Sequence, residues 1–203
     1  MNEMPTLLSS SDLTAFHDAC HAQAGWAKDG EARHAAGAWI FVELNHRYNC
    51  LLWDEEDLAR RKQVADSEIA ANKRAIDGYN QERNDAIERI DETLLAQLSA
   101  ANVKPGARLN SETAGSMVDR LSILSLKIHH MRLQTVRADV DRSHVDSCSA
   151  RLARFLEQRR DLAGCLDRLL AESSRGEACF KVYRQFKMYN DPSLNPAVYG
   201  EKR

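Results

Sequence analysis

Apolar residues recur every three or four positions along most of this chain, which is the spacing of one face of an α-helix. From residue 68 to residue 98 the apolar face consists of Ile69, Ile76, Ile87, Ile90, Leu94 and Leu98. A similar series runs from Met117 to Met131, and another from Leu152 to Leu170. The pattern predicts long amphipathic helices, and no part of the chain requires a strand.

Turn-forming residues divide this pattern into segments. We expect a short helix over residues 13–23 and four long helices over 32–64, 67–101, 112–143 and 146–173. A short last helix over 177–188 and an extended tail over 189–203 complete the expected elements. These segments predict an all-α fold, an up-and-down bundle of about four long helices with short flanking helices. We expect one domain over residues 1–203, with 1–31 as the N-terminal helix and loop and 32–188 as the bundle.

Polar side chains interrupt the apolar face of the helix predicted over 67–101. Lys73, Asn80, Arg83, Asn84 and Asp91 fall on or beside that face at the same angular spacing. A buried polar group is costly unless it is paired. The polar positions therefore indicate either a structural network or a site.

A second polar line lies on the preceding helix and contains His46, Asn49, Trp53, Glu56, Asp57 and Arg60. The two lines meet if the helices pack antiparallel. Arginine and lysine side chains suit a phosphate or a sugar acid, and Glu56 or Asp57 suits a base or a metal ligand. The alternative is an interhelical salt-bridge network with Trp53 in the core.

Small polar residues precede the helix predicted over 112–143. Ser111, Glu112 and Thr113 begin this run, and exposed backbone N–H groups at such a helix start bind anions. The alternative is an ordinary capping sequence. Asp119, Arg120 and Lys127 extend the polar set along the same helix. The candidate ligand-binding residues are therefore His46, Asn49, Trp53, Glu56, Asp57, Arg60, Lys73, Asp77, Asn80, Arg83, Asn84, Ser111, Glu112, Thr113, Asp119, Arg120 and Lys127.

Four carboxylate-x-x-His pairs have the spacing used in di-metal helix bundles, at residues 18/21, 31/34, 43/46 and 141/144. Such sites need two copies on facing helices and further carboxylates at matched depth. In a chain this rich in acids we expect chance matches, and we predict no metal centre. No Walker loop, dinucleotide-binding turn or nucleophile elbow is present, so catalytic residues and any cofactor remain unassigned.

Charge and composition exclude some partners. The net charge is −2 and the pI is about 6.4, so we expect no nucleic acid as a bulk electrostatic partner. The most apolar stretch, Ala35–Val42, is far shorter than the roughly 20 residues needed to span a membrane. Five scattered cysteines indicate reduced structural thiols, and no secretory signal begins the chain, so we expect a cytoplasmic location.

Four strings of residues resemble a known bacterial family. They are Asn49-x-x-Leu-Trp-x-x-Glu-Asp-x-Ala-Arg60, Lys73-Arg-x-Ile-Asp-x-x-Asn-x-x-Arg-Asn-Asp85, Asn110-Ser-Glu-Thr-x-Gly-x-Met-x-Asp-Arg-Leu-Ser-Ile-Leu-x-Leu-Lys-Ile128 and Gln185-Phe-Lys-Met-Tyr-Asn-Asp-Pro192. They are similar to the family known as domain of unknown function 4254. The resemblance implies an all-helical cytosolic protein, often encoded beside glycosyltransferases and genes of lipopolysaccharide or surface-polysaccharide assembly. It supplies no established activity or catalytic residue.

Three hypotheses for function follow. The first is a cytosolic component of surface-glycan assembly that binds a sugar phosphate or nucleotide sugar in the polar pocket. The second is a helical interaction module that docks on a glycosyltransferase. The third is a Mg²⁺-dependent nucleotide pyrophosphohydrolase-like enzyme that uses Glu55, Glu56, Asp57, Asp85, Glu88 and Asp91. Whether the protein is an enzyme, and whether it forms a homo-oligomer, stays open at this point.

Overall fold

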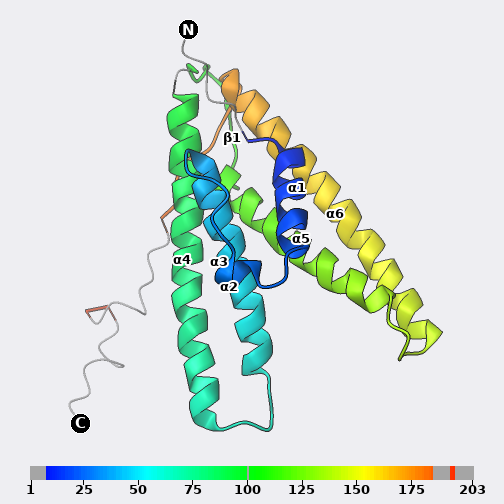
Figure 1. Cartoon of the computed structure of the whole chain (residues 1–203). Helices are drawn as coiled ribbons and strands as arrows, with labels where there is room; N and C mark the ends of the chain where they lie inside the picture. Colours follow the sequence, from blue (N-terminus) through cyan, green and yellow to red (C-terminus); the bar gives the residue numbers. More distant parts are fainter. Residues whose placement is uncertain (1–7, 100, 185–192, 195–203) are drawn as a thin grey trace.

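The computed structural model describes residues 8–99, 101–184 and 193–194, and within these ranges the chain forms six helices and two short strands (Figure 1). The helices are α1 (Ser10–His21), α2 (Trp26–Asp29), α3 (Ala38–Ala59), α4 (Asp66–Leu98), α5 (Ala114–Thr135) and α6 (Arg142–Ser174). The strands are β1 (Arg108–Leu109) and β2 (Ala178–Cys179), which pair in parallel. The predicted all-α fold is confirmed.

The four long helices form two hairpins. The most extensive helix contacts are those between α3 and α4 and those between α5 and α6. Figure 1 shows the α5–α6 hairpin inclined to the α3–α4 hairpin, and the short helix α1 packs on α5 and α6. Because α5 also contacts both α3 and α4, these three helices meet in the middle of the molecule.

Local interactions explain where the helices begin. The side chain of Thr113 accepts the backbone N–H of Ser116 and caps α5, and Asp141 caps α6 by accepting the N–H of His144. The helix predicted from residue 146 therefore begins at residue 142. The helix predicted from residue 32 begins only at residue 38, because Gly37 has a left-handed φ of 66° that interrupts the helical backbone. Both α3 and α5 also end several residues earlier than predicted, at Ala59 and Thr135.

The short helix predicted over residues 177–188 is wrong for the part of it that the structure describes. Residues 178–179 form β2, and residues 180–184 are not helical. The backbone N–H groups of Arg108 and Asn110 donate to the carbonyls of Glu177 and Cys179 at 2.9 and 2.8 Å, which holds this segment extended. Residues 185–188 and the predicted tail, apart from residues 193 and 194, lie outside the described residues.

One hydrophobic cluster joins α1 to α6 and β2, and its fully buried members include Leu13, Ile90, Leu121 and Leu166. Polar side chains share this interior. His17, Asn45, His46, Ser122 and Ser125 are all 0% exposed, so part of the polar line on α3 does face inward. None of the described helices is both long enough and apolar enough to cross a membrane.

Candidate functional site

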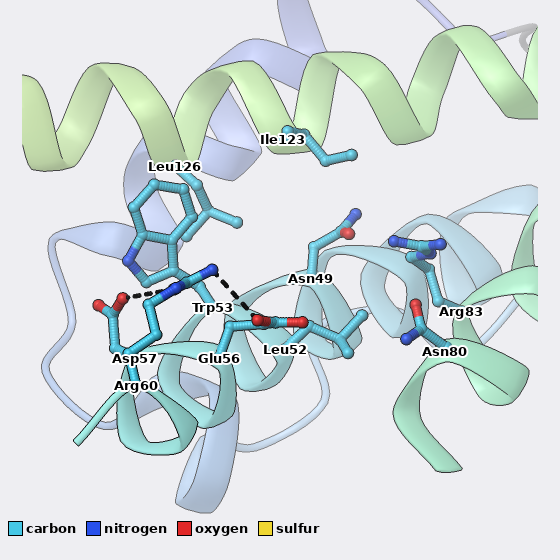
Figure 2. Close-up of a pocket in the computed structure, with 10 residues that line it drawn as sticks. All are labelled: Asn49, Leu52, Trp53, Glu56, Asp57, Arg60, Asn80, Arg83, Ile123 and Leu126. Atoms are coloured by element: carbon cyan, nitrogen blue, oxygen red, sulfur yellow. Dashed lines mark hydrogen bonds and ion pairs between the residues drawn. The ribbon is translucent and has the colours of Figure 1, made fainter. Parts of the chain in front are cut away.

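A pocket of about 300 Å³ lies between α3, α4 and α5 (Figure 2). Helix α3 contributes one wall and α4 contributes the opposite one. Helix α5 closes the pocket with two apolar side chains, Ile123 and Leu126. Seven of the residues selected from the sequence line it, and they are Asn49, Trp53, Glu56, Asp57, Arg60, Asn80 and Arg83.

Helical spacing brings the α3 residues to one side. Asn49, Trp53, Glu56 and Arg60 follow one another at intervals of three or four positions, so they lie along one line of the helix. The Trp53 ring reaches α5, where it stacks on His130 with the ring centroids 4.5 Å apart and the planes 7° from parallel. This stack fixes the aromatic wall of the pocket.

The charged side chains at the rim of the pocket pair with one another. The guanidinium of Arg60 donates to the carboxylates of Glu56 and Asp57 at 3.1 and 3.0 Å (Figure 2). The side chains of Arg60 and Asp57 are about two-thirds exposed, at 66% and 65%. Such solvated ion pairs contribute little to stability, typically about 0–1 kcal/mol.

Arg83 is placed differently. Its guanidinium lies beside Asn80 on the α4 wall (Figure 2), and within the described residues it has neither a hydrogen bond nor an ion pair. Its Nε is buried without a partner, and the indole nitrogen of Trp53 is buried and unpaired as well. A buried donor without an acceptor costs about 1–3 kcal/mol. Both donors are therefore free for an acceptor supplied by a bound molecule or by water.

The deeper polar residues of α3 form a hydrogen-bonded network with α5. The side-chain amides of Asn45 and Asn49 both donate to Oδ1 of Asp119 at 2.9 Å, and Asn49 also donates to Oγ of Ser122 at 3.0 Å. Nδ1 of His46 lies 2.8 Å from the same Ser122 hydroxyl. The predicted polar line thus divides into a closed network that holds Asn49 in place and an open pocket beyond it.

The remaining candidates lie outside this pocket. Lys73 and Asp77 form an exposed ion pair with each other at 3.6 Å. Asn84 is buried and lines a separate cavity of about 310 Å³ together with Ser111 and Thr113. Glu112, Arg120 and Lys127 line a third cavity, of about 600 Å³, between α5 and α6.

A carboxylate of the same chain already occupies the N-terminus of α5. Asp91 of α4 accepts the backbone N–H of Gly115 at 2.6 Å, and burial raises the pKa of Asp91 from 3.8 to about 6. A Cβ on Gly115 would lie 2.5 Å from the carbonyl oxygen of Ile87. This glycine therefore lets the α4 backbone approach the first turn of α5, where the sequence suggested the approach of a ligand.

Three histidines form a cluster that was not predicted from the sequence. His17 and His21 of α1 gather around His46 of α3, with His17 and His46 ring centroids 4.4 Å apart. Burial lowers the pKa of His17 from 6.5 to about 3, and it also lowers the pKa of His21 to about 4. The available signal was the i, i+4 spacing of His17 with His21 and of His46 with Cys50, which places each pair on one helix face.

The carboxylates of Glu43 and Asp18, from two of the carboxylate-x-x-His pairs, already have partners within the chain. Glu43 accepts the backbone N–H groups of Arg33 and His34, and Asp18 accepts the Arg159 guanidinium at 2.7 Å. Over the described ranges, the acids proposed for a Mg²⁺ enzyme form no group of three whose oxygens converge.

The fold and the pocket define an all-α protein in which two inclined helical hairpins enclose a polar site with one aromatic wall. The chain belongs to the family described as "Protein of unknown function (DUF4254)", whose model matches residues 39–182. This match confirms the resemblance, and it covers α3 to α6 together with every residue that lines the pocket. No curated protein and no solved structure matches the chain.

Proposed function

We propose that the pocket between α3, α4 and α5 binds a phosphorylated sugar or a nucleotide sugar, and that the protein is a cytoplasmic component of bacterial surface-glycan or lipopolysaccharide assembly. The observation that carries the binding proposal is the unpaired guanidinium of Arg83 at the pocket wall. The setting follows from the genes that often accompany this family. Docking on a glycosyltransferase and self-association stay predictions.

The chemistry around Arg83 supports this class of ligand. A guanidinium presents donors in a planar fork that matches phosphate oxygens, and hydrogen bonds of this kind are stronger than neutral ones. The Asn80 amide and the Glu56 carboxylate line the same pocket and offer partners for sugar hydroxyls. Trp53 adds an apolar surface and an unpaired N–H donor.

The volume favours a sugar phosphate for the pocket itself. Ligand sites usually measure about 300–1,000 Å³, so a pocket of about 300 Å³ is at the small end. A nucleotide sugar must extend further. The cavity of about 600 Å³ between α5 and α6 shares Ile123 with the pocket and carries Lys127, whose cation suits a second phosphate group. Arg120 in the same cavity is already paired with Glu112.

Calorimetric titration of the full chain tests the proposal. The probes are glucose 1-phosphate, a uridine diphosphate sugar and, as the uncharged control, free glucose. Arg83→Gln removes the guanidinium, and Arg89→Gln is the matched control, because Arg89 lies on the same helix in an exposed ion pair with Glu92. We expect Arg83→Gln to weaken phosphate-dependent binding by at least about tenfold, since a charge-assisted hydrogen bond contributes about 1.5–3 kcal/mol.

The same titrations distinguish binding from a structural role. Binding of neither phosphorylated probe by the wild-type protein contradicts the proposal, as does equal affinity in the wild type and a folded Arg83→Gln variant. If Arg83→Gln does not fold, Arg83→Lys keeps the charge and loses the fork. We then expect weaker but measurable binding of the same probes, and undiminished affinity contradicts the proposal.

A further inference from the structure

Three side chains that can ligate a metal converge between α1 and α3. His21 of α1 and His46 and Cys50 of α3 each offer one ligand atom, and these atoms all lie within 4.8 Å of one another. His46 and Cys50 are four positions apart on one helix, and Nε2 of His46 lies 3.8 Å from Sγ of Cys50. Among the described residues, this is the only group of three or more histidine, cysteine or acidic side chains whose ligand atoms lie this close together.

We propose that His21, His46 and Cys50 bind one thiophilic divalent cation of the zinc class. Two imidazole nitrogens and one thiolate sulfur form a donor set that favours such ions over Mg²⁺ or Ca²⁺. In a tetrahedral zinc site, with Zn–N near 2.0 Å and Zn–S near 2.3 Å, ligand atoms stand roughly 3.3–3.6 Å apart. The His46–Cys50 pair is close to this spacing. Because the three ligand atoms lie within 4.8 Å of one another, closing the site shortens the longest separation by up to roughly 1.5 Å.

Buried serines orient both rings, as hydrogen-bond partners around metal sites commonly do. Nε2 of His21 lies 3.0 Å from Oγ of Ser125, and this hydroxyl donates to the carbonyl of Ser122. The Ser125 oxygen therefore accepts the Nε2 proton of His21, which leaves the lone pair on Nδ1. For His46, the Ser122 hydroxyl contacts Nδ1, so Nε2 is the nitrogen nearer to Cys50.

A cavity next to the three side chains has room for a fourth ligand. It measures about 390 Å³, and its lining includes His21, Cys50, Cys20 and Asp54. A water molecule in this cavity, or the thiol of Cys20, completes four-coordination. The proposed site is separate from the sugar-phosphate pocket and does not depend on the function proposed for it.

The ion binds the three side chains in their deprotonated forms. The thiol proton of Cys50 is released to solvent on binding, and the thiolate and the two neutral imidazole nitrogens bond to the ion.

Titration with Co²⁺ and Zn²⁺ tests the site in the full chain after treatment with a chelator. Co²⁺ bound to a thiolate gives a sulfur-to-metal charge-transfer absorption that imidazole ligands alone do not give. We expect one equivalent of Co²⁺ to produce this band and one equivalent of Zn²⁺ to abolish it. Cys50→Ser should remove the band and weaken Zn²⁺ binding at least tenfold. The matched control is Cys165→Ser, which removes an exposed thiol and should leave both the band and the affinity unchanged.

The wild-type protein alone also decides the question. Bound Zn²⁺ should slow alkylation of Cys50 at least tenfold, as measured by peptide mass spectrometry, and leave alkylation of Cys165 unchanged. Absence of the charge-transfer band in the wild type overturns the proposal. A band that survives in folded Cys50→Ser also overturns it. If that variant does not fold, equal rates of Cys50 alkylation with and without Zn²⁺ in the wild type overturn the proposal instead.

Discussion

Arg83 and Asp91 lie on the same helix, but only the charged group of Asp91 has a hydrogen-bond partner within the described residues. The carboxylate of Asp91 is 2% exposed and accepts the N–H of Gly115, so its position is explained by the fold alone. Arg83 has no such partner within the described residues, and its Nε is buried. A charge that the fold satisfies is a structural element, whereas a charge left unpaired at a pocket is available to a ligand.

Asp91 gives a prediction on stability. Asp91→Asn keeps an oxygen acceptor for Gly115 and removes the ionisation. The pKa of Asp91 is about 6 in the folded chain and near 3.8 when unfolded, so the stabilisation is complete below pH 3.8 and is lost as pH rises through 6. Urea unfolding should show the wild type gaining about 1 kcal/mol over Asp91→Asn between pH 7.5 and pH 5.

The control for this comparison is Asp91→Ala, which removes the acceptor altogether. It leaves the Gly115 N–H buried and unpaired, so we expect a loss of about 1–3 kcal/mol at pH 7. A free-energy difference between the wild type and Asp91→Asn that does not change with pH would show that Asp91 is ionised throughout.

The candidate residues could be predicted from the sequence only in part. Helical spacing places Asn49, Trp53 and Glu56 on one side of α3, and the same argument selects Asn80 and Arg83 on α4. Spacing within a helix does not say how far a neighbouring helix extends over it. Lys73 and Asp77 have the same helical spacing as the pocket residues of α4, yet they form an exposed ion pair outside the pocket.

The long helices were predictable because each combines a regular apolar face with a break on either side. Ile76, Ile90 and Leu94 of α4 are buried as that face requires. The strand β2 was not predictable, because its hydrogen bonds go to residues 108–110, some seventy positions away. The contribution of α5 to the pocket was not predictable either, because it depends on tertiary packing between helices.

The contact between α4 and α5 gives a prediction about helix packing. A Cβ on Gly115 would lie 2.5 Å from the carbonyl of Ile87 and 3.0 Å from the Asp91 carboxylate, so Gly115→Ala forces the two helices apart. We expect a loss of about 1–3 kcal/mol in the free energy of unfolding, measured with urea.

Gly164→Ala is the matched control for this contact. Gly164 lies within α6, and beyond its chain neighbours and the nearby backbone of its own helix no atom lies within 4 Å of the added Cβ. The substitution should raise stability by up to about 1 kcal/mol, because alanine restricts the unfolded chain more than glycine does. Equal effects of the two substitutions would contradict the close approach of α4 and α5.

The molecule as a whole buries several neutral histidines, and this has a consequence for its stability in acid. The pKa of His17 is lowered to about 3 and that of His21 to about 4, and His46 is shifted in the same direction. The unfolded chain takes up these protons near pH 6.5, so the stability that neutral histidines provide is present above pH 6.5. It is lost as pH falls through 6.5 toward the folded values.

We therefore expect the free energy of unfolding to fall by at least about 2 kcal/mol between pH 7.5 and pH 5. His17 alone contributes about 2 kcal/mol, and the other two histidines outweigh the opposite contribution of Asp91. The measurement is urea unfolding at a series of pH values after treatment with a chelator, so that no bound cation contributes. His17→Phe should make the dependence shallower by about 2 kcal/mol over this range. A wild-type stability independent of pH would contradict the neutral cluster.

Two hairpins and a short N-terminal helix place the pocket and the His21–His46–Cys50 group around the same part of α3. The pocket uses residues from three helices, and we propose that its unpaired Arg83 binds a phosphate group. The most direct test is the calorimetric titration of glucose 1-phosphate into the wild-type protein and into Arg83→Gln. We expect saturable binding to the wild type that weakens at least about tenfold in the variant. Absence of binding to the wild type, or equal affinity in both folded proteins, would contradict it.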